Sequence, residues 1–273
     1  MTSITAPRAA REAADLLRDK RIAVLTGAGV STDSGIPDYR GPTSVPRTPM
    51  TYQEFLTPKG RQRYWARSFL GWKRMRTAEP NDGHRALAAL QPRLVGLVTQ
   101  NVDRLHQAAG SSMVVDLHGR VDRVICLTCG RRADRGGYQR ELAERNPRFD
   151  AGAEIEIAPD GDAVLEATDT FVVADCAGCG GIVKPDVVFF GESVPPEVVV
   201  RAVRVVADAD AMLVAGSSLT VYSGRRFVKQ AAQRGIPIVL INRGPTKGDQ
   251  LVDVKWDCGT SEGLTELAAR LGV

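Results

Sequence analysis

The chain has 273 residues, enough for one large domain or for a large domain with a smaller one inserted into it. Hydrophobic residues make up 43% and charged residues 25%, which is ordinary for a soluble globular protein, and no apolar run reaches the roughly 20 residues that span a bilayer. The formal net charge of +4 is small and spread along the chain, so we expect neither a membrane protein nor stable binding of nucleic acid.

The first 21 residues predict a helix rather than a targeting segment. They lack the apolar core of a secretory signal, and the acidic residues among them argue against a transit peptide. Ala9, Ala13, Leu16 and Leu17 follow the spacing of one helix face. We therefore expect a cytoplasmic protein, or a protein of the mitochondrial matrix if the source is eukaryotic, in which thiols stay reduced.

Short apolar runs that alternate with helical patterns predict an open α/β sheet. Helical patterns occupy residues 197–207 and 222–234. Strands alternating with helices imply a parallel sheet with both faces covered. The runs with the character of buried parallel strands are residues 21–26, 94–99, 113–117, 211–215 and 236–241.

Two segments interrupt this alternation and predict a smaller second domain. One contains four prolines and then an aromatic helical stretch, and the other contains paired cysteines and a polar, turn-rich middle. The predicted fold class is therefore α/β, a Rossmann-like parallel-sheet domain with a smaller inserted zinc-binding and helical domain. The boundaries that we assign are 1–41, 81–119 and 184–273 for the Rossmann-like domain, and 42–80 with 120–183 for the small domain.

A glycine-rich stretch, residues 27–35, follows the first predicted strand, which is the context that a dinucleotide loop requires. Small residues let backbone N–H groups approach a pyrophosphate, and the N-terminus of a following helix adds a favourable dipole. The spacing is Gly27-x-Gly29 and then Gly35, not Gly-x-Gly-x-x-Gly. Taken alone, the stretch fits a tight structural turn equally well.

Four of the five cysteines form two Cys-x-x-Cys pairs, Cys126 with Cys129 and Cys176 with Cys179. Two such pairs complete a tetrahedral Zn²⁺ site that has no open position, so one zinc ion per chain would be structural. The separation of the pairs is longer than in a simple zinc ribbon and implies an insertion between them. A redox pair or two unrelated thiol pairs is the alternative.

His118 is the histidine that we expect to be functional. It follows the predicted strand at 113–117, and open α/β sheets bind their ligands at the carboxyl ends of their strands. A neutral imidazole at such a place can act as a general base. His84 and His106 lie beside helical patterns and are expected to be structural.

Two other classes of protein account for part of these signals. A zinc-ribbon nucleic-acid binder explains the cysteines and the mild basicity, but it leaves the polar run at 100–103 and His118 without a role. An NAD-dependent dehydrogenase explains the sheet and the glycines, and would transfer a hydride.

The motifs in their order along the chain resemble those of the sirtuins, which are NAD-dependent protein deacylases. The resemblance runs from about residue 10 to the C-terminus. Within the family the chain is most similar to class II, the group of the mitochondrial sirtuin four, and its arginine-rich composition suggests a bacterial source. The matching segments are 27–31, 35–40, 99–103, 117–119, both cysteine pairs, 184–192 and 216–219, with 61–67, 122–124, 158–162 and 221–224 as the class II features.

The resemblance implies a protein-lysine deacylase, of the deacetylase type, that cleaves NAD⁺ to nicotinamide and transfers the acyl group to ADP-ribose. Mono-ADP-ribosyl transfer to protein from the same site is the alternative. The implied partners are acylated-lysine proteins or peptides, the implied co-substrate is NAD⁺, and the implied catalytic residues are His118 and Asn101. NAD⁺ is implied to bind Gly27, Ala28, Gly29, Ser31, Pro37, Asp38, Tyr39, Arg40, Gln100, Asn101, Val102, Asp103, Gly216, Ser217, Ser218, Asn242, Arg243, Gly244 and Cys258.

Substrate binding is implied for residues of both segments that flank the cysteines. Tyr64 and Arg67 resemble the pair with which some sirtuins grip acidic acyl groups, since i, i+3 spacing places both on one helix face. A surface arginine and a core tyrosine on that helix are an equally weighted alternative. The remaining residues implied in substrate binding are Val188, Phe189, Gly191 and Glu192.

The chain departs from many sirtuins at two places. Tyr39 stands where many have phenylalanine, and it still supplies a ring for the nicotinamide ribose. Ser223 and Gly224 stand where many have proline and alanine, beside the segment that pairs with substrate in the family. The second departure leaves the affinity for peptide open.

Overall fold

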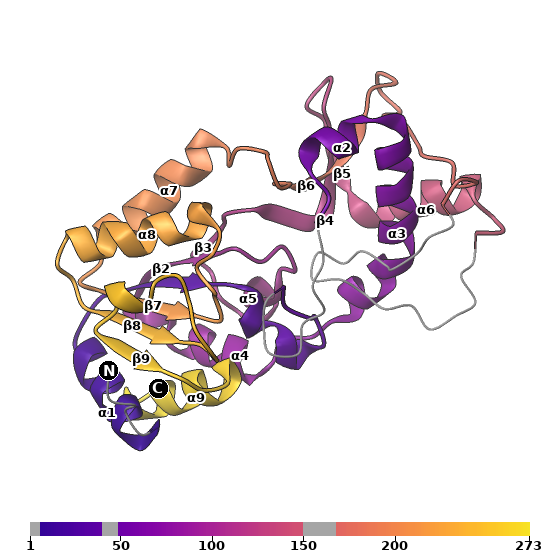
Figure 1. The fold of residues 1–273 in the computed structure, drawn as a ribbon. Coiled ribbons are helices and arrows are strands. Elements are labelled where there is room, and N and C mark those ends of the chain that lie inside the picture. The colour runs from indigo at the N-terminus through magenta and orange to yellow at the C-terminus, as the bar shows by residue number, and fades with distance from the viewer. Residues whose placement is uncertain (1–5, 40–48, 150–167) are drawn as a thin grey trace.

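The computed structural model describes residues 6–39, 49–149 and 168–273, and the arrangement of their helices and strands is drawn in Figure 1. A six-stranded sheet runs in the order β3-β2-β1-β7-β8-β9, and each neighbouring pair in it is parallel. Its strands are β1 (Ile22–Thr26), β2 (Leu94–Thr99), β3 (Val114–Asp116), β7 (Ala211–Ala215), β8 (Ile238–Ile241) and β9 (Val254–Trp256). All five strands predicted from apolar runs are confirmed, whereas β9 was not predicted.

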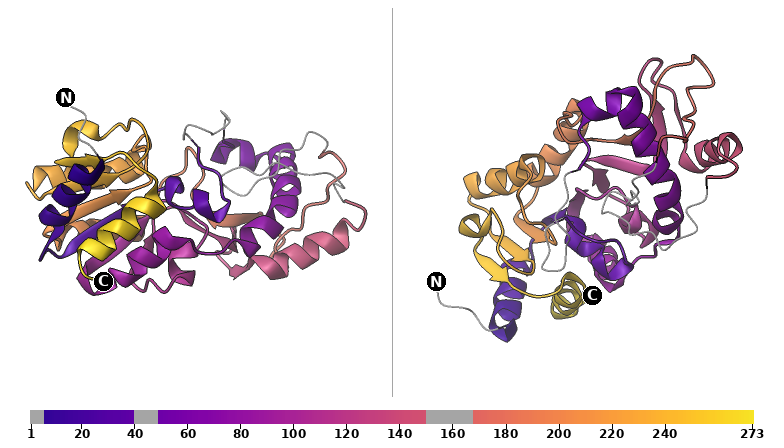
Figure 2. Two further views of the ribbon diagram at one scale, coloured as in Figure 1. Left: turned by 90° about the horizontal axis from the view of Figure 1, so that it is seen from below. Right: turned by 45° about the vertical axis from the view of Figure 1, so that its right-hand side comes forward.

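Helices cover both faces of this sheet, which is why its central strands are apolar along their whole length. Every residue of β1 and β7 is buried. On one face pack α1 (Ala6–Leu17), α4 (Asp82–Ala89) and α9 (Thr260–Arg270), and α1 and α9 lie together there (Figure 2). On the other face pack α7 (Pro196–Ala207) and α8 (Tyr222–Gln233). The predicted α/β class with a parallel sheet is therefore confirmed.

Short helices and 3-10 turns complete this part of the chain. A capping box begins α4, in which Asn81 accepts the backbone N–H of His84. The remaining elements are α5 (Leu105–Ala108) and the 3-10 turns η1 (Ala28–Val30), η2 (Thr32–Ser34), η3 (Gln91–Arg93) and η4 (Asp249–Leu251).

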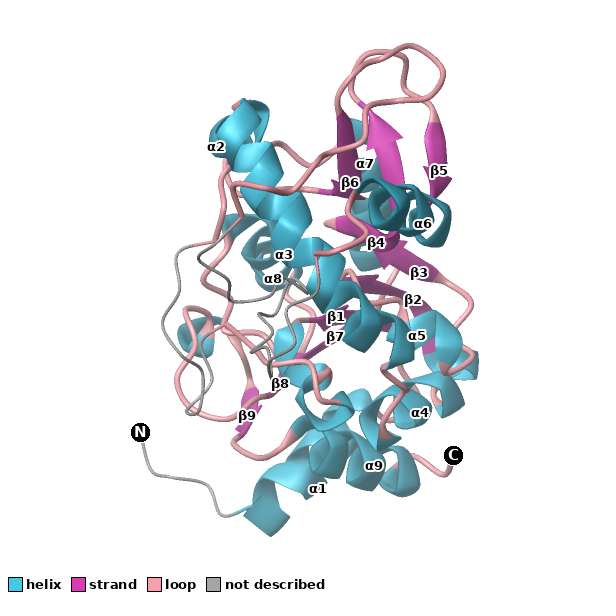
Figure 3. Cartoon of the chain, turned by 90° about the vertical axis from the view of Figure 1, so that its right-hand side faces the viewer, coloured by secondary structure: helices cyan, strands magenta, loops and turns pink. Residues whose placement is uncertain are grey.

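A second, antiparallel sheet carries the four cysteines. Its order is β5-β4-β6, with β4 (Gly119–Cys126), β5 (Arg132–Asp134) and β6 (Val183–Val187). Against it pack α2 (Tyr52–Leu56), α3 (Pro58–Thr77) and α6 (Arg135–Arg145), seen at the top of Figure 3. The predicted small zinc-binding and helical part is therefore present as a distinct layer with its own core.

An arginine lies at the centre of this smaller core. Arg135 is fully buried, and its guanidinium lies 5.1 Å from the ring centre of Trp65 and 5.0 Å from that of Trp72. The same guanidinium also donates from Nη2 to the Ser68 carbonyl over 3.3 Å. Cation–π contacts that are shielded from water contribute about 2 kcal/mol each, so these rings help to offset the burial of the charge.

Two histidines lie in the core of the larger part. The backbone N–H of Asn81 donates to Nδ1 of His84 over 3.3 Å, and Nε2 of His106 lies 2.9 Å from the hydroxyl of Thr26. Their ring centres are 4.8 Å apart, and both side chains are buried.

None of the helices that the structure describes combines the length and the apolar character that crossing a bilayer requires.

Candidate active site

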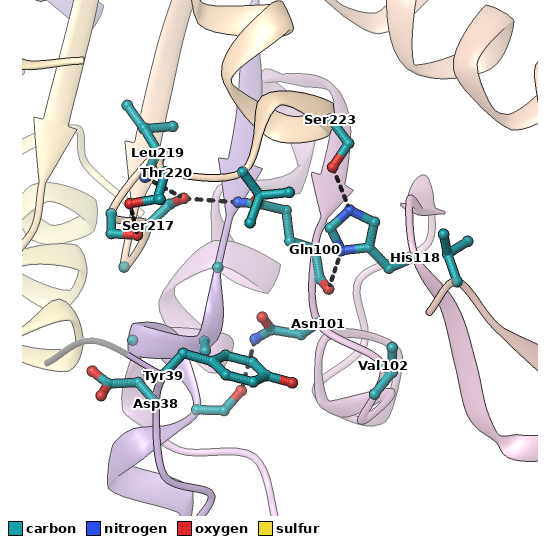
Figure 4. A pocket seen from close by; sticks show the side chains of 18 of the residues that line it. Asp38, Tyr39, Gln100, Asn101, Val102, His118, Ser217, Leu219, Thr220 and Ser223 are labelled. Atoms are coloured by element: carbon teal, nitrogen blue, oxygen red, sulfur yellow. Dashed lines mark hydrogen bonds between the residues drawn. The ribbon is translucent and has the colours of Figure 1, made fainter. Parts of the chain in front are cut away.

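A cavity of about 1070 Å³ opens at the carboxyl ends of β1, β2, β7 and β8, where they face the segment that follows β6. Residues far apart in the sequence line it, among them 100–103, 187–194 and 216–223; part of this lining is drawn in Figure 4. Open parallel sheets bind their ligands at this edge. The volume lies at the upper end of the roughly 300–1,000 Å³ of small-molecule sites, which leaves room for a dinucleotide together with a second ligand.

Gly27 and Gly29 allow the loop after β1 to lie directly against the loop after β7. A Cβ on Gly27 would lie 2.7 Å from the Gly216 carbonyl oxygen, and one on Gly29 would lie 2.9 Å from the Gly216 Cα. Gly216 itself has a φ of 62°, which favours glycine. The stretch continues as the 3-10 turns η1 and η2. Our prediction that a helix N-terminus adds its dipole here is therefore wrong, because three-residue turns replace the helix.

A buried polar network joins this loop to the loop after β2. The Ser31 hydroxyl donates to Asp103 over 2.7 Å, and the Asn101 amide donates to Ser31 over 3.0 Å. Asp103 also accepts the backbone N–H of Leu105 over 2.9 Å. Burial raises the pKa of the Asp103 carboxyl, and the hydrogen bonds from Leu105 and Ser31 act in the opposite direction. The network fixes the position of Asn101 within the cavity.

His118 is held at both ring nitrogens, as Figure 4 shows. Its Nδ1 lies 3.0 Å from the backbone carbonyl oxygen of Gln100, and its Nε2 lies 2.7 Å from the hydroxyl of Ser223. A carbonyl oxygen only accepts, so Nδ1 carries the proton in the neutral ring and the Nε2 lone pair accepts from Ser223. The Gln100 side chain is fixed in turn, since it donates to the Ser217 hydroxyl over 2.8 Å.

The electrostatic environment keeps this imidazole neutral. Burial lowers the pKa of His118; the hydrogen bond to the Gln100 carbonyl opposes this shift, and the positive charge of Arg226 adds to it. A neutral ring with its proton fixed on Nδ1 keeps its basic electron pair on Nε2, where the Ser223 hydroxyl donates to it. That is the form of histidine that accepts a proton as a general base.

Residues that follow β8 and β9 form another part of the cavity wall. Asn242 donates from its side chain to the Arg243 carbonyl over 2.7 Å, and the Thr260 hydroxyl donates to the Gly29 carbonyl over 2.8 Å. Cys258 lines the cavity between them and is partly buried. Burial raises the pKa of its thiol to about 12, so it is uncharged near neutral pH.

Most residues predicted to bind NAD⁺ line this one cavity. Pro37 and Gly244 are not among the lining residues, and Arg40 lies outside the described residues. The predicted residues that line it are Gly27, Ala28, Gly29, Ser31, Asp38, Tyr39, Gln100, Asn101, Val102, Asp103, Gly216, Ser217, Ser218, Asn242, Arg243 and Cys258.

The segment after β6, predicted to bind substrate, spans the two parts of the molecule. The N–H of Val188 donates to the His118 carbonyl over 2.8 Å, and the N–H of Tyr52 donates to the Phe190 carbonyl over 2.9 Å. Glu192 accepts the N–H of Phe189 over 2.9 Å. All residues from 187 to 194 line the cavity, so one wall is a tethered backbone segment.

Of the two residues on α3 expected to bind an acidic acyl group, Tyr64 lines the cavity and Arg67 does not. Tyr64 is buried and lines the cavity, with its ring centre 5.2 Å from that of Phe189. Arg67 is partly exposed and is not among the lining residues. The geometry favours the alternative of a core tyrosine, here one that also forms a wall of the cavity.

The sequence gave no reason to connect several lining residues with His118. Val199, Val200 and Tyr222 line the cavity from α7 and α8, and their apolar character fitted core packing equally well. Ser223 did carry a signal, because it departs from the proline of many sirtuins. That departure marked residue 223 as unusual, but it did not predict the hydrogen bond between Ser223 and His118.

The four predicted cysteine ligands lie together at the tip of the small sheet. Their sulfur atoms lie within 4.8 Å of one another, with Sγ–Sγ distances of 3.5 Å for Cys126–Cys179 and 3.9 Å for Cys129–Cys176. A tetrahedral site with Zn–S bonds of about 2.3 Å places its sulfurs about 3.8 Å apart, so the group fits zinc. Each turn ends in a left-handed glycine, Gly130 with φ 71° and Gly180 with φ 68°.

Comparisons with known proteins agree with this geometry. The sequence profile of the Sir2 family matches residues 27–223. NAD-dependent protein deacetylase 1 of Mycobacterium avium is 55% identical over 263 residues, covering 94% of this chain and 93% of that protein. NAD-dependent protein deacetylase 1 of Streptomyces coelicolor is 52% identical, covering 95% and 89%. A solved structure described as "Sir2-p53 peptide-NAD+" is 30% identical, with a TM-score of 0.73 and 96% of each chain covered.

A dinucleotide-sized cavity with a neutral histidine inside it, beside a closed metal module, is the arrangement of an α/β enzyme that uses a nucleotide. The match over residues 27–223 and the identity to relatives along nearly the whole chain make the assignment specific. The chain belongs to the Sir2 family, the sirtuins. The resemblance drawn from its motifs is confirmed at the level of the family.

Proposed function

We propose that this protein is an NAD-dependent protein-lysine deacetylase in which His118 is the general base. The observation that carries the proposal is the neutral imidazole held between Gln100 and Ser223, with Nε2 at 2.7 Å from the Ser223 hydroxyl. Relatives that are more than 50% identical along nearly the whole chain are named NAD-dependent protein deacetylases. Identity of this extent supports the same reaction here.

The cavity supports NAD⁺ as the co-substrate. When bound, NAD⁺ supplies a ribose carbon that bears the leaving nicotinamide, and hydroxyl groups beside it. The loops at 27–31 and 216–218 offer glycine-lined backbone for the pyrophosphate, and Asn242, Arg243 and Cys258 form the end proposed for the adenosine. Asn101, fixed by Ser31, is proposed to orient the ribose.

His118 then serves the transfer of the acyl group. Its Nε2 takes a proton from a ribose hydroxyl, which makes that oxygen a better nucleophile toward the acyl carbon. Before this step the acyl carbonyl oxygen bonds to the ribose carbon as the bond from that carbon to nicotinamide breaks, and afterwards one water is consumed as the lysine amine leaves. The products are nicotinamide, free lysine and an acyl-ADP-ribose ester. The base remains ready near neutral pH, because burial lowers the pKa of His118.

The walls near the segment after β6 support a small, uncharged acyl group. Tyr64 and Phe189 pack edge to face there, while Arg67 is not a lining residue. We also propose that the protein belongs to class II, on the basis of segments 61–67, 122–124 and 221–224, and that it acts in the bacterial cytoplasm. The fourth class II segment, 158–162, lies outside the described residues. Its relatives come from bacteria, and reduced thiols suit a four-cysteine zinc site.

The test is product analysis on a panel of acyl-lysine peptides with NAD⁺. We expect the acetyl peptide to lose its acyl group as nicotinamide and acetyl-ADP-ribose form in equal amounts, detected by mass spectrometry. His118→Tyr, compared as folded protein, is the control without the base. Peptides that remain acylated while a protein gains ADP-ribose would instead favour mono-ADP-ribosyl transfer.

A further inference from the structure

The contact between Ser223 and His118 supports the assignment of the base, but the reaction described above gives the Ser223 hydroxyl no task of its own. Ser223 is the second residue of α8 and lies 105 positions from His118 in the chain, yet its Oγ is 2.7 Å from Nε2. The proline that many sirtuins have at this place offers no side-chain hydrogen bond. We propose that the Ser223 hydroxyl is a positioning residue, which orients the imidazole of His118 and stabilises its protonated form.

The hydroxyl closes the second of two hydrogen bonds that define the plane of the ring. The Gln100 carbonyl holds Nδ1 at 3.0 Å, and a single such bond leaves the ring free to swing about it. With Ser223 on the opposite nitrogen, the ring is held at both ends, and Nε2 points toward the Ser223 hydroxyl, which is itself part of the cavity wall. Orientation of a base toward its proton is a precondition of general-base catalysis.

A hydroxyl suits this place because it can either donate or accept. It donates to Nε2 of the neutral ring. For Nε2 to accept the proton, the Ser223 O–H first turns away from the Nε2 lone pair. As the O–H bond of the substrate hydroxyl breaks and the Nε2–H bond forms, the Ser223 oxygen then accepts that N–H. The proton thus remains on His118, and the electron pair of the broken O–H bond stays on the substrate oxygen, which bonds to the acyl carbon. Burial and Arg226 both disfavour the cationic ring, so an acceptor oxygen matters most in that state.

Gly224 makes the same arrangement possible from the other side. A Cβ at this position would lie 2.4 Å from Oε1 and 2.6 Å from Cδ of Gln100. The Gln100 side chain, which donates to the Ser217 hydroxyl over 2.8 Å, would therefore have to shift from this position if residue 224 carried a Cβ. Ser223 contacts one nitrogen of the base, and Gly224 leaves space for the residue whose carbonyl holds the other. This links Ser223 and Gly224, which together form the second departure from the family pattern, to one task.

The inference rests on the proposed function for its kinetic test, but it has a direct test that does not. Ser223→Ala removes the hydroxyl, Ser223→Thr keeps it, and Ser112→Ala is a matched change at an exposed serine. The pKa of His118 can be followed by NMR among only three histidines. We expect Ser223→Ala to lower that pKa, because the imidazolium loses its acceptor, and Ser223→Thr to leave it close to the wild-type value.

The kinetic readout uses the full-length protein with NAD⁺ and an acetyl-lysine peptide. We expect kcat of Ser223→Ala to fall about 10- to 100-fold, the size expected for a lost hydrogen bond to a charged group, with KM for NAD⁺ nearly unchanged. The acid limb of its pH profile should move to lower pH. Ser223→Thr should recover most of kcat, and Ser112→Ala should match the wild type.

Three results would overturn the inference. One is Ser223→Ala with a wild-type His118 titration. Another is Ser223→Ala with a wild-type kcat and pH profile. The third is Ser223→Thr, folded and with its zinc, failing as completely as Ser223→Ala. Because the titration needs no turnover, an enzyme that proves inactive on every acyl peptide contradicts the proposed function while the titration still decides the role of Ser223.

Discussion

Lys184, on β6, and Glu192, in the cavity-lining segment 187–194, form an ion pair. The Lys184 side chain is only 5% exposed, and its Nζ lies 2.9 Å from Oε2 of Glu192. The same ammonium donates to the Val187 carbonyl, and the same carboxylate accepts the N–H of Phe189. The pair therefore closes the turn between β6 and the proposed substrate wall. Burial lowers the pKa of Lys184, and Glu192 opposes that shift.

We expect Glu192→Gln to destabilise the protein, because it leaves the buried ammonium without its counter-charge. Breaking a buried ion pair by removing one partner costs about 3–5 kcal/mol, whereas an exposed pair contributes about 1 kcal/mol or less. Glu266→Gln, which breaks the exposed pair with Arg270, is the matched control. Urea unfolding measures both. Equal free energies of unfolding for the two variants would contradict the view that the Lys184 ammonium depends on the Glu192 charge.

The four-cysteine group should bind one zinc ion per chain and hold the small sheet together. Binding of structural zinc contributes on the order of 10–16 kcal/mol in small zinc-finger peptides, so Cys126→Ser should unfold this part rather than merely slow turnover. Zinc content by elemental analysis and limited proteolysis of the β4–β6 region measure the effect. Cys258→Ser should keep its zinc, because Cys258 lies away from the group. Wild-type melting of Cys126→Ser without metal would contradict this role.

Much of the fold could be predicted because its signals are local. Apolar runs such as residues 211–215 are buried on both faces of the sheet, and burial of that kind requires hydrophobic residues throughout. The cysteine pairs with Gly130 and Gly180 are local as well, since each turn needs a left-handed residue just after its second ligand. The position of His118 followed from the end of one strand.

Contacts between distant segments could not be predicted in this way. Ser223 meets His118 only because α8 begins beside the end of β3, an arrangement that no spacing encodes. Arg135 would ordinarily be placed on the surface, and it is buried because two tryptophans from α3 surround it. The short strand β9 has only three residues, Val254–Trp256, too few for a periodic signal. The packing of Tyr64 against Phe189, from a distant segment, is another contact that the sequence pattern does not indicate.

Arg67→Met should affect acidic and neutral acyl peptides alike. Arg67 is not among the described residues that line the cavity, so we expect its charge not to contact the acyl group. A charge-assisted hydrogen bond to an acidic acyl chain would typically be worth about 1.5–3 kcal/mol, or more than tenfold in kcat/KM. The measurement is kcat/KM for succinyl and acetyl peptides in both proteins. A fall in kcat/KM for the succinyl peptide alone would show that Arg67 does contact the acyl group.

His118 should be the only histidine whose replacement removes turnover from a protein that remains folded. General-base assistance contributes roughly 10²–10⁴-fold, so His118→Tyr should nearly abolish deacetylation. Zinc content should be unchanged, and NAD⁺ binding should persist in weakened form, since the proposed pyrophosphate contacts come from backbone at 27–31. Because burial lowers the pKa of His118, the acid limb of kcat/KM in the wild type should lie below the usual histidine value of about 6.5.

His84→Ala and His106→Ala should act on stability instead. Burial lowers the pKa of His84 from 6.5 to about 4, and it lowers that of His106 well below the usual value. The unfolded chain therefore binds protons more readily than the folded one between about pH 6.5 and 4, so stability is complete above that window and is lost as the pH falls through it. Both alanine variants should be less stable at neutral pH and lose part of this dependence, while turnover per folded molecule changes little. The deciding comparison is turnover normalised to folded protein. Near wild-type turnover in His118→Tyr, with loss in either of the others, would place the base elsewhere.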